Sequence, residues 1–235
     1  MNNKIEKIKL DRTKPLGNQI YAQLRKKIIV TELYPLSEIY ESDLAKNLNV
    51  SRTPVRDALK KLENEGLIKT IPQVKSIIAK IDTSQIKQAN EIRVTLENSV
   101  VNKLSKIINK NQIVTLSRIN LKISQNLKLK KFNNVYYFDN MFHQTLANQA
   151  KMPMTWQIIN QINTQIDRVR NISYKHQGDI TYGPIQAIKD HQEIINFLSL
   201  KNTKNVKKAM QNHILSLQRY VLFIKKKKEY KNVID

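Results

Sequence analysis

The sequence predicts a mainly α-helical protein of two domains, a small N-terminal domain over residues 1–82 and an all-helical domain over residues 83–235. Three observations lead to this prediction. The chain of 235 residues is long enough to bury two hydrophobic cores. It contains only four glycines and six prolines, which favours long helices joined by short turns. Apolar residues recur at helical spacing over most of the chain, with one short segment of a different character.

The first domain is predicted from the order of its elements. Residues 15–31 have apolar side chains at helical spacing and begin with a proline suited to a first turn. A short helix is expected at about 41–48, and after a turn a second helix at about 53–65 that stops at Gly66. Residues 67–81 are rich in isoleucine around a Pro-Gln turn, which predicts a β-hairpin. Helix, helix, turn, helix and hairpin is the order of a winged helix-turn-helix domain.

Helical patterns continue almost without interruption through the second domain. Short breaks divide them into six predicted helices, near 84–108, 111–130, 132–150, 153–172, 184–200 and 203–226. Long amphipathic helices with short links are typical of an antiparallel bundle. The sequence therefore predicts a C-terminal all-α antiparallel six-helix bundle.

Composition indicates a cytoplasmic protein. The absence of cysteine excludes disulfide bonds and thiolate metal ligands. The N-terminal residues lack the apolar stretch of a signal peptide, and no run of eighteen apolar residues is present that could cross a membrane. We therefore expect a cytoplasmic chain with no membrane partner.

The formal net charge of +22 makes nucleic acid the first candidate partner and an anionic membrane surface the second. The charge is unevenly distributed, because residues 1–82 carry a net charge of +6 and residues 83–235 carry +16. Most of the excess lies outside the winged domain, and much of it is expected to be solvated helix surface. Net charge by itself is therefore weak evidence of function.

The segment from Leu44 to Leu59 has the features of a DNA-reading helix-turn-helix. Its apolar residues form the buried stripes of two helices, and Thr53 and Pro54 suit the start of the second helix. Arg52 and Arg56 are then left near the exposed N-terminal turn, from which a recognition helix contacts base edges. An arginine in that position can donate two hydrogen bonds to guanine O6 and N7.

Other polar residues around this helix suit backbone contacts. Ser51 and Thr53 can donate to phosphate oxygens, which fix the register without reading sequence. Lys69 and Lys75 lie around the hairpin and could reach the DNA backbone or the minor groove. An ordinary helical hairpin with two surface arginines is the alternative. The wing together with the Ser-Arg-Thr-Pro turn favours the DNA-binding interpretation.

Three of the four histidines form a pattern with one aspartate. Asp139 and His143 are four residues apart on one predicted helix and therefore share a face. His191 and His213 lie eleven residues on either side of Asn202, the predicted turn between the last two helices. In an antiparallel pair of helices, both side chains then lie at about the same distance from that turn along the helix axes. Three imidazoles and one carboxylate suit zinc or another divalent transition metal, with nickel and manganese as alternatives, and leave positions open for a ligand.

The stretch NVSRTPVRDALKKLENEGLI, with the isoleucine-rich segment after it, resembles the GntR family of bacterial regulators, in its FadR-like branch. The resemblance covers about residues 15–82 and implies that Arg52 and Arg56 contact DNA. The family often has an arginine, a further DNA contact, at the position of Ser42, and it usually has glycine at the wing tip where this chain has Lys75. The candidate DNA contacts are Ser42, Ser51, Arg52, Thr53, Arg56 and Lys75.

The second domain resembles the FCD sensor domain, the partner of FadR-like readers. The family pattern is Asp-x3-His followed by one histidine on each of the last two helices, and it is matched by Asp139, His143, His191 and His213. The segment 91–97 resembles the opening helix of that domain, in which an arginine commonly points into the pocket. Arg93 is therefore the candidate that binds an effector carboxylate, with an inter-helix salt bridge to a bundle acid as the alternative. The resemblance implies a small organic acid as effector.

Together these features predict a transcriptional repressor. It would be a homodimer that places two recognition helices on a near-palindromic operator and is released by its effector. Two other classes stay open. A metal-dependent hydrolase would use the His/Asp set to activate water, although no second catalytic acid or base accompanies the set. A non-specific polyanion binder would not distinguish an operator from random DNA.

Overall fold

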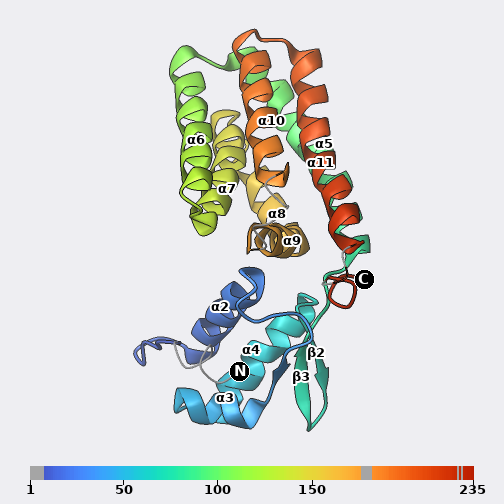
Figure 1. Ribbon diagram of the computed structural model, residues 1–235. Helices are drawn as coiled ribbons and strands as arrows, with labels where there is room; N and C mark the ends of the chain where they lie inside the picture. The colour runs from blue at the N-terminus through green and yellow to red at the C-terminus, as the bar shows by residue number, and fades with distance from the viewer. Residues whose placement is uncertain (1–7, 176–181, 227, 229) are drawn as a thin grey trace. The chain divides into compact units, whose positions relative to one another are not determined.

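The computed structural model describes residues 8–175, 182–226, 228 and 230–235 (Figure 1). His176, which the sequence pattern places in a polar surface loop, lies outside these residues. The chain divides into two compact units. The winged unit contains the described residues up to Ile81 together with 230–235, and the bundle unit extends from Asp82 to Lys228.

The winged unit contains three helices and a small sheet. They are α2 (Leu16–Ile29), α3 (Glu41–Leu48), α4 (Arg52–Asn64), β1 (Glu38–Ile39), β2 (Ile68–Ile71) and β3 (Lys75–Ile78). The strands are antiparallel in the order β1-β3-β2. The predicted helices and hairpin are thus confirmed. Strand β1 was not predicted, because two residues cannot establish an alternating pattern.

The turn between α3 and α4 sets the position of the recognition helix. Asn49 ends α3 in the left-handed region with φ 50°, a conformation that asparagine tolerates better than most residues. Val50 then packs against the apolar core of the unit. Helix α4 begins at Arg52 with Ser51 as its N-cap, two residues before the predicted cap Thr53. This shift leaves the first turn of α4 exposed, as expected.

The tip of the wing has a strained residue. Gln73, between β2 and β3, has φ 60°, in the region that favours glycine. Lys75 is instead the first residue of β3 and pairs with Ile71. The position at which glycine would relieve the backbone is therefore Gln73, and not Lys75, where the family resemblance placed it.

The C-terminal residues belong to the winged unit, whereas the sequence analysis assigned everything after residue 82 to the bundle. The N–H of Ile81 donates to the carbonyl of Val233 (2.9 Å), and the N–H of Asp235 donates to the carbonyl of Ile81 (2.9 Å). Ile81 and Ile234 form a parallel bridge and are both buried. So short a backbone pairing has no sequence signature.

In its described residues, the bundle unit consists of helices that begin at Thr83. Its helices are α5 (Thr83–Ile107), α6 (Lys110–Lys128), α7 (Phe132–Gln149), α8 (Pro153–Ile162), α9 (Thr164–Lys175), α10 (Tyr182–Ser199) and α11 (Thr203–Lys225). Five of the six predicted segments agree with single helices. The predicted helix 153–172 is two helices that meet at Asn163, so the described part of the bundle has seven. Asn163 keeps a helical φ of −74°, and with neither glycine nor proline nearby the sequence pattern gives no sign of the break.

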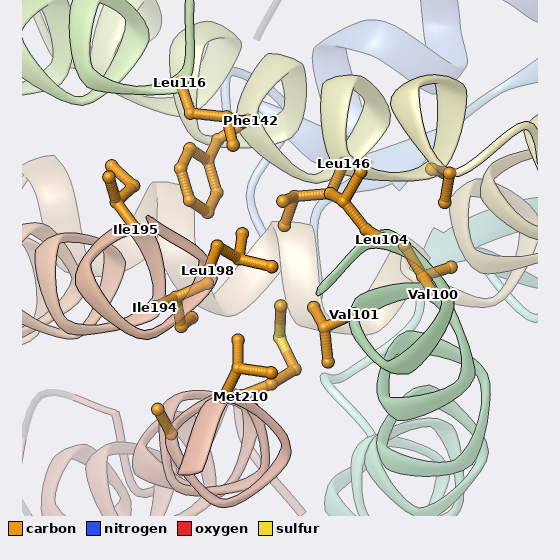
Figure 2. Close-up of a cluster of buried hydrophobic side chains, with 14 of the residues drawn as sticks. Val100, Val101, Leu104, Leu116, Phe142, Leu146, Ile194, Ile195, Leu198 and Met210 are labelled. Carbon is orange, nitrogen blue, oxygen red and sulfur yellow. The ribbon is translucent and has the colours of Figure 1, made fainter. Parts of the chain in front are cut away.

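Helices α5, α6, α7, α10 and α11 surround the main apolar core of the bundle (Figure 2). Helix α11 packs on α5 and α10, and α6 packs on α7 and α10. Figure 2 shows Val101, Phe142 and Met210 from three of these helices converging in the core, where they are at most 2% exposed. No helix in the described ranges is long and apolar enough to cross a membrane.

Candidate nucleic-acid interface and metal centre

A groove of about 760 Å³ lies between α4 and the β2–β3 hairpin of the winged unit. It is lined by Glu41, Ser42, Arg52, Arg56, Leu59, Lys60, Glu63 and residues 70–76. Four of the six predicted DNA contacts thus border one concave surface. The other two, Ser51 and Thr53, are exposed at the start of α4. The structure therefore places four of the predicted contacts along one groove and the other two at the exposed start of α4.

Both predicted base-reading arginines face solvent. Arg52 is exposed and has no hydrogen-bond or ion-pair partner among the described residues. The side chain of Arg56 is 68% exposed and is paired with Glu41 of α3. The distances are 2.9 Å from Nη2 to Oε1 and 3.2 Å from Nε to Oε2. Hydrogen bonding to Glu41 raises the pKa of Arg56 above its ordinary value, so the side chain stays a cation.

The wing is attached to the helices by two carboxylates that the sequence analysis did not consider. Glu63 of α4 accepts a hydrogen bond from the backbone N–H of Thr70 in β2 (2.9 Å). Lys75, a predicted DNA contact, is ion-paired with Glu38 of β1. These bonds fix the hairpin against α4 and β1, and DNA would have to compete with Glu38 for Lys75.

The segment before α2 also reaches the helix-turn-helix. Arg12 donates from Nη2 to the backbone carbonyl of Asn49 (3.2 Å) and is exposed. Arg12 precedes Pro15, where the first predicted element begins, and was not among the predicted contacts. No local pattern could have indicated it, because the two residues are 37 positions apart.

In the bundle unit, the structure brings Asp139, His143, His191 and His213 together. Helix α7 supplies the first two, and α10 and α11 supply one histidine each. One possible ligand atom from each residue lies within 4.8 Å of the others. All four residues are buried, with at most 4% of their surface exposed.

Two of these imidazoles face each other across the cluster. Nε2 of His143 lies 3.2 Å from Nε2 of His213. Nδ1 of His143 lies 2.5 Å from Oε2 of Glu97, and Nδ1 of His213 lies 3.3 Å from Oδ2 of Asp190. Because a carboxylate only accepts, a ring with a single N–H would carry that hydrogen on Nδ1 and present a lone pair at Nε2. Two lone pairs at this distance would repel each other unless a metal ion or a proton lay between them.

The donor set fits a divalent transition metal. Two nitrogens bound at 2.0–2.1 Å to a tetrahedral zinc are about 3.4 Å apart, close to the separation of the two Nε2 atoms. His191 is fully buried, yet neither of its ring nitrogens has a hydrogen-bond partner in the described part of the chain. Burial and the neighbouring His213 lower the pKa of His191 well below its ordinary value, so its ring is neutral and available as a ligand.

Two arginines hold the acids of the cluster. Nη1 of Arg170 in α9 lies 2.9 Å from Oδ2 of Asp139. Nε and Nη2 of Arg93 lie 2.8 and 2.7 Å from Oε1 of Glu97. Burial alone would raise the pKa of both carboxyls, but the arginines and imidazoles outweigh it and hold both pKa values below their ordinary range. Arg93, the candidate effector contact, is thus paired with an acid, within α5 rather than between helices.

Aromatic rings close two sides of the cluster. Phe142 stacks on His191 with ring centroids 4.0 Å apart. Trp156 of α8, the only tryptophan of the chain, lies parallel to His143 with centroids 6.5 Å apart. Neither ring was among the residues predicted for the site. The tryptophan provides an optical signal close to the metal ligands.

The acids behind the imidazoles were also missed. Glu97 lies on the same face of α5 as Arg93, four residues away, which is a local signal that could have been used. Its contact with His143 joins residues 46 positions apart, and no pattern indicates that contact. Asp190 precedes His191 directly, but it serves His213 on the next helix.

We expect Glu97→Gln to weaken metal binding by about 10- to 100-fold, the usual effect of losing an outer hydrogen-bond partner. An amide accepts more weakly than a carboxylate and leaves His143 less basic. The measurement is a Ni²⁺ titration followed by Trp156 fluorescence, in competition with a chelator. Glu91→Gln is the control, because Glu91 is an exposed acid on the same helix. Equal affinities for both variants and the unmodified chain would contradict the expectation.

Comparison with protein families agrees with both units. Residues 16–78 match the model of the bacterial regulatory proteins of the gntR family, and residues 88–216 match the FCD domain. The FCD match alone covers more than half of the chain. The chain belongs to the GntR family of bacterial regulators and carries an FCD domain.

Curated relatives of this GntR regulator cover most of its length. The HTH-type transcriptional repressor RspR of Escherichia coli (strain K12) is 29% identical over 212 residues, 90% of this chain and 91% of RspR. The gluconate operon transcriptional repressor of Bacillus licheniformis is 23% identical over 86% of this chain and 83% of that protein.

Solved structures share the fold. McbR/YncC of E. coli superposes with a TM-score of 0.66 at 20% identity, over 87% of this chain and 98% of that one. A GntR regulator from Rhodococcus sp. RHA1 gives 0.67 at 18% identity, over 88% and 97%. The winged helix-turn-helix and helical FCD architecture predicted from the sequence is therefore confirmed.

The family assignment decides among the function classes left open by the sequence. The relatives are regulators of transcription, and the hydrolase alternative has no support among them. This GntR regulator is a DNA-binding transcriptional regulator and not an enzyme.

Proposed function

We propose that this regulator is a homodimeric repressor that leaves a near-palindromic operator when a small organic acid binds at a divalent metal in its FCD domain. The observation that carries the proposal is the buried cluster, in which Nε2 of His143 lies 3.2 Å from Nε2 of His213, beside a His191 ring whose nitrogens have no hydrogen-bond partner among the described residues. Zinc is the first candidate for this set of nitrogen and oxygen donors, with nickel and manganese as alternatives. The cytoplasm is the proposed location.

The groove of the winged unit supports the DNA-binding half of the proposal. Arg52 and Arg56 stand at the exposed start of α4, from which a recognition helix reaches base edges in the major groove. The remaining proposed contacts are with DNA phosphates and with the part of the duplex that would face the wing. They are made by Ser42, Ser51, Thr53 and Lys75. A two-fold dimer would present two such helices to successive half-sites.

The composition of the cluster supports a carboxylate effector. Four protein ligands complete a tetrahedral ion, so an effector carboxylate would bind by raising the coordination number of the metal to five or six. Arg93 is a second proposed contact. Because the guanidinium of Arg93 is already paired with Glu97, an effector carboxylate would have to share Arg93 with Glu97 or displace Glu97 from it. The repressors RspR and the gluconate operon repressor support the proposed direction of regulation.

Release of DNA requires that the effector bind two arrangements of the protein with different affinity. Metal and effector would bind more tightly to the arrangement in which the two recognition helices do not fit both half-sites. Their binding free energy would therefore stabilise that arrangement relative to the one that binds DNA. A ligand with equal affinity for both arrangements would stabilise the chain without any effect on DNA.

The test is a thermal-shift screen of small organic acids on the full chain, once loaded with zinc and once stripped by a chelator. An effector at 100 times its Kd is expected to stabilise the loaded protein by about 2.7 kcal/mol and to leave the stripped protein unchanged. Each acid found is then added to a protein–DNA complex followed by fluorescence anisotropy, where release is expected. Failure to bind zinc even after refolding with it, or equal stabilisation with and without chelator, would overturn the proposal.

A further inference from the structure

The ion pair between Arg56 and Glu41 uses only one edge of the guanidinium. Glu41 accepts from Nε and from Nη2, which form the side edge of the planar group. A guanidinium has five N–H donors, and the end edge formed by its two Nη atoms still offers one hydrogen on each. Guanine O6 and N7 form a matching pair of acceptors. Arg56 can therefore hold Glu41 and a guanine at the same time.

Glu41 is the fixed partner of this pair. It is the first residue of α3, where the helix dipole favours a carboxylate, and α3 packs on α4. Its side chain is 29% exposed, against 68% for that of Arg56. Both residues line the groove in which the predicted DNA contacts gather. The carboxylate thus lies beneath the arginine and anchors it from the protein side.

Two consequences follow for DNA recognition. A long arginine side chain loses conformational entropy when it is ordered by DNA, and the pair with Glu41 orders Arg56 beforehand. The negative charge of Glu41 also opposes the approach of phosphates, which provide nearly all of the affinity for random DNA. Both effects favour a DNA on which Arg56 finds a guanine.

We propose that Glu41 is a specificity-determining residue of DNA recognition, which orients Arg56 for end-on donation to a guanine and opposes its use as a phosphate contact. Neighbouring acids do not share this role. Glu38 is paired with Lys75, and Glu63 accepts from Thr70. Within the described ranges, Glu41 is the acid that is ion-paired with Arg56.

The test is Glu41→Gln in the full chain, with DNA sites selected by the unmodified protein from a pool of random duplexes. Affinities for a selected site and for random DNA are measured over a range of salt concentrations. We expect the affinity for the selected site to fall about 10-fold while that for random DNA stays equal or rises, so that their ratio falls at least about 10-fold. A new selection with the variant is expected to lose the guanine preference at one position of each half-site.

Asp43→Asn is the matched control, because it removes one negative charge from the same helix and Asp43 contacts Ser42 (3.3 Å), a proposed phosphate contact, but not Arg56. It is expected to change both affinities alike and to leave their ratio unchanged. In an Arg56→Ala background, Glu41→Gln is expected to have no further effect on the ratio. Thermal denaturation checks the fold of each variant, and Glu41→Asp carries the test if the glutamine variant does not fold.

The proposal is wrong if Glu41→Gln leaves the ratio and the guanine preference unchanged. It is equally wrong if the ratio falls by the same factor in Asp43→Asn, or if Glu41→Gln still lowers it when Arg56 is absent. None of these results depends on a metal or an effector.

Discussion

Replacement of Arg52 or Arg56 by alanine is expected to weaken operator binding by about 5- to 150-fold and to relax the sequence preference of the regulator. Each side chain is exposed at the start of α4, the part of a recognition helix that contacts base edges. Neither packs into the core of the winged unit, so alanine is not expected to disturb the fold. The measurement is fluorescence anisotropy with a selected site and with random DNA, together with a footprint.

Lys60→Ala is the matched control for the arginine variants. Lys60 lines the same groove one turn further along α4. We expect Lys60 to contact a phosphate, so the variant should bind all sequences more weakly by a similar factor. The slope of the logarithm of affinity against the logarithm of salt concentration should fall in magnitude by about one. An arginine variant with an unchanged footprint and an unchanged preference would remove the assignment of α4 as the DNA reader.

The second large effect is expected at the metal centre. His191→Ala should lower metal affinity by more than about 100-fold, beyond the loss that an outer hydrogen-bond partner causes. His191 is fully buried, its ring is neutral, and neither ring nitrogen has a hydrogen-bond partner among the residues that the structure describes, although Nε2 lies 3.7 Å from Oδ1 of Asp139. The effector response should be lost with the metal, while DNA binding is retained. The measurements are metal content by atomic absorption and Ni²⁺ quenching of Trp156 fluorescence.

Two further variants make this result interpretable. Alanine leaves a cavity beside Phe142, which stacks on the ring, and so His191→Gln is included to fill the space. Gln192→Ala is the control, because Gln192 is the next residue of α10 and is exposed. Full metal occupancy in both His191 variants would show that the cluster is not the binding site.

The sequence was sufficient wherever function follows from helical periodicity. The start of α4 follows, to within two residues, from the apolar stripe and the Ser-Arg-Thr-Pro turn. The metal cluster follows from the spacing of Asp139 and His143 and from the equal distances of His191 and His213 from their turn. Each of these inferences uses only the geometry of one helix or of one helical hairpin.

The sequence was insufficient wherever side chains distant in the chain meet. Glu41 contacts Arg56 across 15 positions, and Glu97 contacts His143 across 46. Such pairs depend on how helices pack, which periodicity does not determine. The division of the predicted helix 153–172 at Asn163 and the two-residue strand β1 were missed for a different reason, since neither contains enough residues or a strong enough breaker to alter the pattern.

Donation of hydrogen bonds from Arg52 and Arg56 to DNA bases is tested by replacing each guanine of a selected half-site with 7-deazaguanine, which lacks the N7 acceptor. When a contacted guanine is replaced, we predict that the affinity of the unmodified regulator for the DNA falls about 10-fold, the effect of losing one hydrogen bond to a charged donor. The affinity of the corresponding alanine variant is predicted not to fall. Unchanged affinity at every guanine of the half-site would contradict donation by either arginine.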